Sequence, residues 1–132
     1  MLDKYPQQVR LVFKNYPLRS HKFARQAATA ALAAHAQGRF WEFHDALFAS
    51  YSKLNEAKVE EIRAQLNLDK KAFDAQRKAP QVTGQIQKDI RLASEAGVRA
   101  TPSVFINGRF QKKRSLKNFS AAVDAELQRL DK

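Results

Sequence analysis

The sequence predicts an α/β fold in which one strand is followed by several helices, a β-hairpin and a final helix. Three observations predict this class. The apolar run at residues 11–13 favours a strand covered on both faces. Apolar residues then recur at helical spacing between Phe23 and Ala96, and Asn107-Gly108 between apolar segments is a strong hairpin signal. At 132 residues and 44% hydrophobic content the chain is long enough for one compact domain with a sizeable core.

The first half of the chain is expected to be mainly helical. Asn15-Tyr16-Pro17 ends the strand predicted for residues 9–14, and Ser20 is a plausible cap for an alanine-rich helix that stops at Gly38. Residues 40–50 form the next predicted helix. We expect its aromatic cluster to lie in the core, and this cluster consists of Phe40, Trp41, Phe43 and Phe48, with Leu47 on the same side.

Local signals mark the remaining elements. Asn55 and Asp69 begin two short helices, and a longer helix over residues 81–96 is stopped by Gly97, where a left-handed residue is favoured. Two antiparallel strands should flank Asn107-Gly108. Ser115 then caps a last helix, whose apolar stripe comprises Leu116, Phe119, Val123, Leu127 and Leu130.

The Thr101-Pro102 step joins the long helix to the hairpin. Proline cannot donate to a strand ladder and it favours extended geometry in the residue before it. If the peptide bond is cis, the preceding backbone groups face outward, where an extended peptide could pair with them. The alternative is a trans proline that only marks the turn from helix to strand.

Four segments, in this order and spacing, resemble the DsbA-like branch of the thioredoxin superfamily. They are residues 9–18, the Ala27-Ala28 and Ala30-Ala31 pairs, residues 37–48 with the sequence QGRFWEFHDALF, and the Thr-Pro loop with its hairpin. The resemblance extends from Leu2 to Leu130. It implies a thioredoxin-like fold with a helical insertion at about residues 20–80, and a single partial thioredoxin-like domain over residues 1–132.

The same resemblance implies that the first strand and most of the first helix of the family fold are missing. Residues 2–6 look like the end of the helix that carries a Cys-x-x-Cys pair at its start in the family. Met1 is then an internal start codon, a chosen boundary of the expressed chain, or the true start of a degenerate paralogue, and the sequence leaves all three open.

The family implies thiol-disulfide exchange, yet this chain has no cysteine. Because the thiolate is the nucleophile in that exchange, the chain is predicted to be redox-inactive alone, with no catalytic residue, cofactor or metal ligand. The resemblance assigns substrate binding to Ala100 and Thr101 through backbone pairing, and to Pro102, which shapes the edge. Extended or unfolded protein segments are the implied partners.

Two other functions stay open. The first is a noncatalytic peptide-binding or assembly module that keeps the proline loop. The second is a basic nucleic-acid or membrane-surface binder, because the net charge is +11 and residues 107–117 contain five basic residues without an acid. A solvated basic face is the simpler interpretation, since aromatic residues do not alternate with the basic ones as a stacking platform requires.

The missing strand would lie in the middle of the family's sheet, so we expect self-association or poor solubility of the isolated chain. The resemblance implies a periplasmic or other extracytoplasmic location, although this chain shows no signal peptide and no run of about 20 apolar residues. His21, His35 and His44 lack the spacing of metal ligands, and His44-Asp45 is most simply a surface pair.

Overall fold

The structure is a computed structural model, and it describes residues 2–19 and 21–131. The chain forms two compact units. One consists of Lys14–Ala96, and the other joins Met1–Phe13 to Gly97–Lys132. Each unit has its own internal packing.

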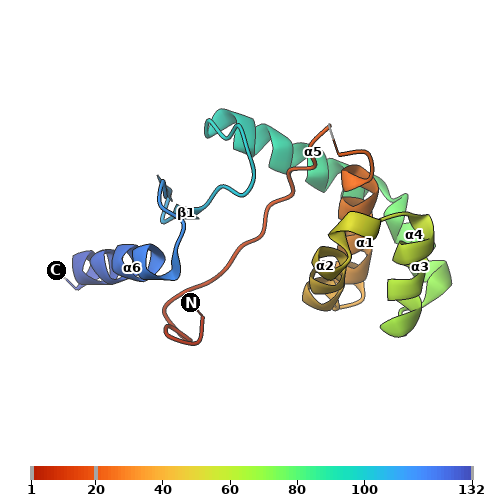
Figure 1. The fold of residues 1–132 in the computed structure, drawn as a ribbon, viewed down its shortest axis with the longest axis horizontal. Coiled ribbons are helices and arrows are strands. Elements are labelled where there is room, and N and C mark those ends of the chain that lie inside the picture. The colour runs from red at the N-terminus through yellow and green to blue at the C-terminus, as the bar shows by residue number, and fades with distance from the viewer. Residues whose placement is uncertain (1, 20, 132) are drawn as a thin grey trace. The chain divides into compact units, whose positions relative to one another are not determined.

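The Lys14–Ala96 unit is helical. Helix α1 packs against α2, α4 and α5, and α2 packs against α3 (Figure 1). The elements are α1 (Ala24–Ala36), α2 (Phe40–Ala49), the short 3-10 helix η1 (Tyr51–Lys53), α3 (Glu56–Gln65), α4 (Lys70–Arg77) and α5 (Pro80–Glu95). Because α1 is rich in alanine, its neighbours can approach its backbone closely.

Capping residues begin α3 and α4 as the sequence predicted, whereas α1 begins after Phe23, which provides no side-chain cap. The Asn55 side chain accepts a hydrogen bond from the Lys58 amide, and the Asp69 side chain accepts one from the Ala72 amide, both at 2.8 Å. Gly97 follows α5 with a φ of 82°, a conformation that glycine adopts without strain. Ser20, the predicted cap of α1, lies outside the described residues.

The core of this unit lies between α1, α2, α3 and α4. The Phe43 and Phe73 side chains are almost fully buried, and their ring centroids are 5.6 Å apart. Around them lie the buried residues Ala30, Ala31, Ala33, Ala34, Leu47, Val59, Ile62 and Leu68. Burying a phenylalanine side chain contributes about 1.5–3 kcal/mol, so these two rings are major contributors to the stability of the unit.

The prediction of a wholly buried aromatic cluster on α2 is wrong in part. Phe43 is buried and Phe40 is half-buried, but Trp41 is 42% exposed and Phe48 is 63% exposed. Phe43 and Leu47 are four residues apart and therefore lie on one row of the helix, whereas Phe48 is a further 100° or so around the axis. The core contact of α2 is narrower than its apolar stripe.

The second unit contains the hairpin and the last helix. Strand β1 (Phe105–Ile106) pairs antiparallel with β2 (Arg109–Phe110), with Phe105 opposite Phe110. Asn107 and Gly108 have φ values of 48° and 80°, and positive φ at both positions is what a type I′ turn requires. The hairpin and its turn are therefore as predicted.

Helix α6 (Leu116–Leu130) begins where Ser115 was expected to cap it, since the Ser115 side chain accepts from the Asn118 amide at 3.1 Å. Val123 is the buried residue of its apolar stripe, while Leu116 and Leu130 at the two ends are exposed. The buried Tyr5 side chain attaches the amino-terminal segment to this helix, because its hydroxyl donates to the Asp124 carboxylate at 2.6 Å.

The prediction of a strand at residues 9–14 that is buried on both faces is wrong. No strand forms there, and Leu11 and Val12 are 58% and 54% exposed. A strand needs a neighbour for its backbone groups, and within the described residues no segment forms a ladder with this one. The amino-terminal segment is attached to the rest of its unit by the Tyr5 side chain and not by strand pairing.

Candidate functional site

The loop between α5 and β1 carries the predicted substrate-binding residues. Ala100, Thr101 and Pro102 are all exposed, and the Thr101–Pro102 peptide bond is cis. The loop itself contains neither helix nor strand, because the residues before β1 form bends and irregular backbone. The loop thus presents its main chain at the surface of its unit.

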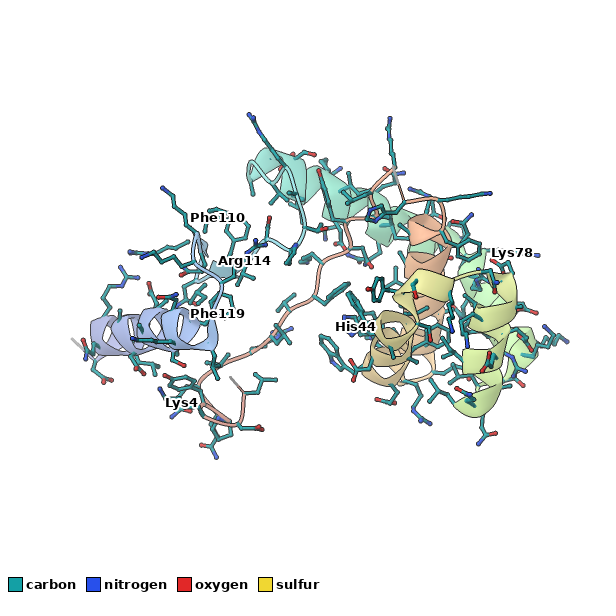
Figure 2. All side chains as sticks on the ribbon, viewed as in Figure 1. Lys4, His44, Lys78, Phe110, Arg114 and Phe119 are labelled. Carbon is teal, nitrogen blue, oxygen red and sulfur yellow. The ribbon has the colours of Figure 1, made fainter. Side chains whose placement is uncertain are left out.

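Two side chains hold the carbonyl groups on either side of Thr101. The Ser103 hydroxyl donates to the Ala100 carbonyl at 2.6 Å. The Arg114 side chain, which is labelled in Figure 2, lies on the segment between β2 and α6. Its guanidinium donates to the Pro102 carbonyl. These contacts fix the backbone immediately before and immediately after Thr101.

Thr101 lies between these two anchored carbonyls. Across the described residues, no hydrogen bond uses the Thr101 amide or the Thr101 carbonyl. A main-chain donor and acceptor that remain unused at a surface are the groups to which an extended peptide binds by strand addition. The loop therefore offers one residue with free backbone pairing capacity between two anchored carbonyls.

The hairpin after the loop is tied to α6 by Glu126, whose side chain is only 10% exposed. Its carboxylate accepts from the Asn107 amide group at 3.3 Å, and it lies 3.3 Å from the Arg109 guanidinium and 2.9 Å from that of Arg129. The Asn107 hydrogen bond, followed by the one from Arg129, holds the pKa of Glu126 below its ordinary value. Glu126 thus fixes the turn of the hairpin.

Sequence reasoning missed three of these residues. The sequence pattern assigns no contact to Ser103 or Glu126, and it presents Arg114 only as one charge in a basic run. The serine directly after proline was an available signal, because serine hydroxyls commonly bond to a nearby backbone carbonyl or amide. Arg114 and Glu126 act across 12 and 19 residues of chain, and such partners are not readable from local pattern.

His35 and His44 lie on successive helices, and the rings of both lie near that of Phe40. His35 is on α1, where its ring lies 6.1 Å from that of Phe40, and His44 is on α2, where Nδ1 lies 3.0 Å from the Asp45 carboxylate. Among residues 2–19 and 21–131, no three His, Asp or Glu side chains converge in a way that would hold a metal ion. The described helices also include none that is long and apolar enough to span a bilayer.

Comparison with known proteins supports the assignment of the fold. Residues 1–125 match the family described as Thioredoxin. The crystal structure of a thioredoxin-like oxidoreductase from Silicibacter pomeroyi DSS-3 matches with a TM-score of 0.86 and 32% identity, over 96% of this chain and 73% of that chain.

Two sequence relatives have a different name. The Na(+)/H(+) antiporter NhaA 3 of Salinispora tropica is 38% identical over 102 residues, which are 76% of this chain and 16% of the antiporter. The antiporter NhaA of Nitrosospira multiformis is 34% identical over 108 residues, which are 81% of this chain and 17% of the antiporter. The chain thus spans about a sixth of the length of these curated relatives. From the family match and the structural match together, the chain belongs to the thioredoxin family and has a thioredoxin-like fold with a helical insertion.

Proposed function

We propose that this chain is the substrate-holding portion of a DsbA-like thiol-disulfide oxidoreductase and is redox-inactive alone. The observation that carries the proposal is the unpaired backbone of Thr101, held between the anchored carbonyls of Ala100 and Pro102. The fold and the similarity to a thioredoxin-like oxidoreductase support the family of reactions.

In this function an extended protein segment pairs with the Thr101 amide and carbonyl. The chain contributes position, not electrons, because it has no cysteine to attack a disulfide. A thiolate from a further polypeptide segment would attack a substrate disulfide that the proline loop holds in place. The mixed disulfide forms as the S–S bond of the substrate breaks, and the other substrate sulfur leaves as a thiolate. An extracytoplasmic location, where such exchange takes place, belongs to this proposal.

A redox assay tests the inactivity of the chain. The purified 132-residue chain is mixed with insulin and dithiothreitol, and the precipitation of reduced insulin is timed. We expect the rate of dithiothreitol alone, since neither serine nor threonine hydroxyls exchange disulfides. Acceleration proportional to the concentration of the chain would contradict the proposal.

Peptide binding tests the role of Thr101. An extended, cysteine-free fluorescent peptide is titrated with the chain, and fluorescence anisotropy is measured. The same peptide with an N-methyl group on the pairing residue should bind at least tenfold more weakly, because it cannot donate to the Thr101 carbonyl. N-methylation one residue further along, where the amide points away, is the matched control. Equal affinities of all three peptides would refute backbone pairing.

A noncatalytic peptide-binding or assembly module is the second candidate function. It is favoured by a separate observation, namely that relatives 34–38% identical to this chain are named as Na(+)/H(+) antiporters, of which the matching segment is about a sixth. Both candidates predict peptide binding. The DNA that precedes codon 1 discriminates between them: an open frame encoding Cys-x-x-Cys supports the oxidoreductase, and a stop codon supports the module.

A further inference from the structure

The Lys14–Ala96 unit contains a cavity of about 450 Å³ where the chain turns from Tyr16 into α1 and passes α5. This volume is within the range of small-molecule sites. The cavity is lined by Tyr16, Pro17, Leu18, Arg19, His21, Lys22, Arg25, Gln87 and Ile90. Nothing in the function proposed above uses it.

The lining is strongly cationic. Arg19, Lys22 and Arg25 contribute three positive charges, and the described residues that line the cavity include no Asp or Glu. None of the three forms an ion pair or a side-chain hydrogen bond with another described residue, in contrast to Arg63 and Arg77, which each bind a glutamate. Like charges that converge without compensation repel each other, so a bound anion would stabilise this arrangement.

A carboxylate does lie near the cavity, but it is already hydrogen-bonded to other groups. Asp89 is buried on α5, and its carboxylate accepts from the backbone amide and the side-chain amide of Asn15, both at 2.9 Å. Gln85 donates to its other oxygen at 2.8 Å, and Lys14 lies 4.0 Å away. The Asp89 carboxylate therefore holds Asn15 against α5 and does not neutralise the cations that line the cavity.

The start of α1 makes the cavity more positive. Its N-cap residue, Phe23, provides no side-chain hydrogen bond, and the first turn contains no acid. The positive end of a helix dipole is ordinarily stabilised by acidic side chains, whereas here Lys22 and Arg25 flank it. An anion in the cavity offsets both the helix end and the three cations.

We propose that this cavity binds the phosphate group of a small organic phosphate. Two guanidinium groups and one ammonium group match the −1.5 to −2 charge of a phosphate monoester better than the single charge of a carboxylate. The Pro17, Leu18 and Ile90 side chains and the Tyr16 ring provide apolar surface for the organic part of the ligand. The site is independent of the proline loop.

Calorimetric titration of the full chain tests the proposal with three probes: phenyl phosphate, inorganic phosphate and benzoate. Phenyl phosphate should bind in a saturable manner and more tightly than either of the others, because it alone combines the double charge with an apolar body. Arg19→Gln and Arg25→Gln should each weaken its binding about tenfold, the loss expected for one charge-assisted contact.

Arg91→Gln and Lys71→Gln are the matched controls. Both residues are exposed in the same unit outside the cavity, and each substitution removes one positive charge. Equal weakening by all four substitutions would reduce the effect to general attraction and overturn the proposal. Absence of saturable binding, or equal binding of inorganic phosphate and phenyl phosphate, would overturn it as well.

A second measurement uses the unaltered chain, so its result does not depend on whether the variants fold. In two-dimensional NMR spectra of the unaltered chain, phenyl phosphate should shift the amide signals of Lys22, Arg25, Gln87 and Ile90 along one saturation curve. Shifts confined to residues 107–117 would place the anion on the basic hairpin region and refute the assignment of this cavity.

Discussion

Phe43 and Phe48 are both on α2, yet only one of them lies in the core. Phe43 stacks near Phe73 and is fully buried, whereas Phe48 is 63% exposed. Replacing Phe43 with alanine should lower the free energy of unfolding by about 3–5 kcal/mol, because a large cavity remains. Phe48→Ala should cost less than about 1 kcal/mol. Urea denaturation followed by circular dichroism measures both, and similar losses would contradict the core described above.

Asp89 offers a second test at the level of single residues. Asp89→Ala leaves the Asn15 amide and side chain without their acceptor in a buried place. We expect a loss of about 3 kcal/mol in the free energy of unfolding of this unit. Glu95→Ala, an exposed position on the same helix, is the control and should change stability by less than about 0.5 kcal/mol. A neutral Asp89→Ala would show that the carboxylate is not needed at this junction.

At the scale of elements, the best sequence predictions are those decided by neighbouring residues. Asn55, Asp69 and Ser115 each bond to an amide three residues ahead, so a short stretch of sequence contains the whole interaction. The Asn107-Gly108 turn is equally local, because positive φ at both positions is a property of those two residues.

The predictions that failed concern partners at a distance. Residues 9–14 have the apolar composition of a buried strand, but pairing is decided by another segment, and no described segment supplies a ladder. On α2, periodicity predicted an apolar face but not how wide the contact with α1 would be. The Arg114–Pro102 contact and the convergence of Arg19 with Gln87 also depend on folding, so spacing alone did not show them.

The attachment of the hairpin to α6 should depend on pH. The folded-state pKa of Glu126 lies below its ordinary 4.5, mainly because Asn107 and then Arg129 donate to the carboxylate. A lowered pKa contributes stability that is present above pH 4.5 and is lost as the pH falls through the folded-state value. Protection of α6 amides against hydrogen exchange, corrected for intrinsic rates, should therefore fall below pH 4.5.

Two variants test whether Glu126 causes this loss of protection in acid. Glu126→Gln should lower the protection of α6 at pH 7 and flatten its decline in acid, since the titrating group is gone. Arg129→Gln should reduce the decline only in part, because Asn107 still donates to Glu126. If the protection of α6 amides in Glu126→Gln falls in acid by the same amount as in the unaltered chain, other carboxylates cause the decline.

At the scale of the whole molecule, we predict self-association. Leu11 and Val12 are exposed on a segment whose backbone forms no ladder with other described residues. Such a segment can pair with a second copy. Sedimentation equilibrium should show an average mass that rises with concentration, and Leu11→Lys combined with Val12→Lys should restore the monomer. Leu92→Lys, at a 39% exposed position on α5, is the control and should leave the association unchanged. A monomer with one cooperative unfolding transition would contradict the prediction.

The charge of the chain shows what folding adds to composition. The sequence indicated a solvated basic face from the excess of 24 basic over 13 acidic residues. In the structure, Lys4 lies 3.8 Å from the Asp124 carboxylate in one unit, while Arg19, Lys22 and Arg25 line a cavity in the other. Cations that look alike along the chain thus have different surroundings, which composition cannot distinguish.

The unused main-chain groups of Thr101 have a consequence for the choice of partners. Amide and carbonyl groups are the same in nearly every residue, so recognition through them ignores side chains. A protein held at this position would be selected for being unfolded enough to extend, and not for carrying a particular motif. Many different unfolded proteins could then bind. Only proteins whose own folding buries their backbone would be excluded.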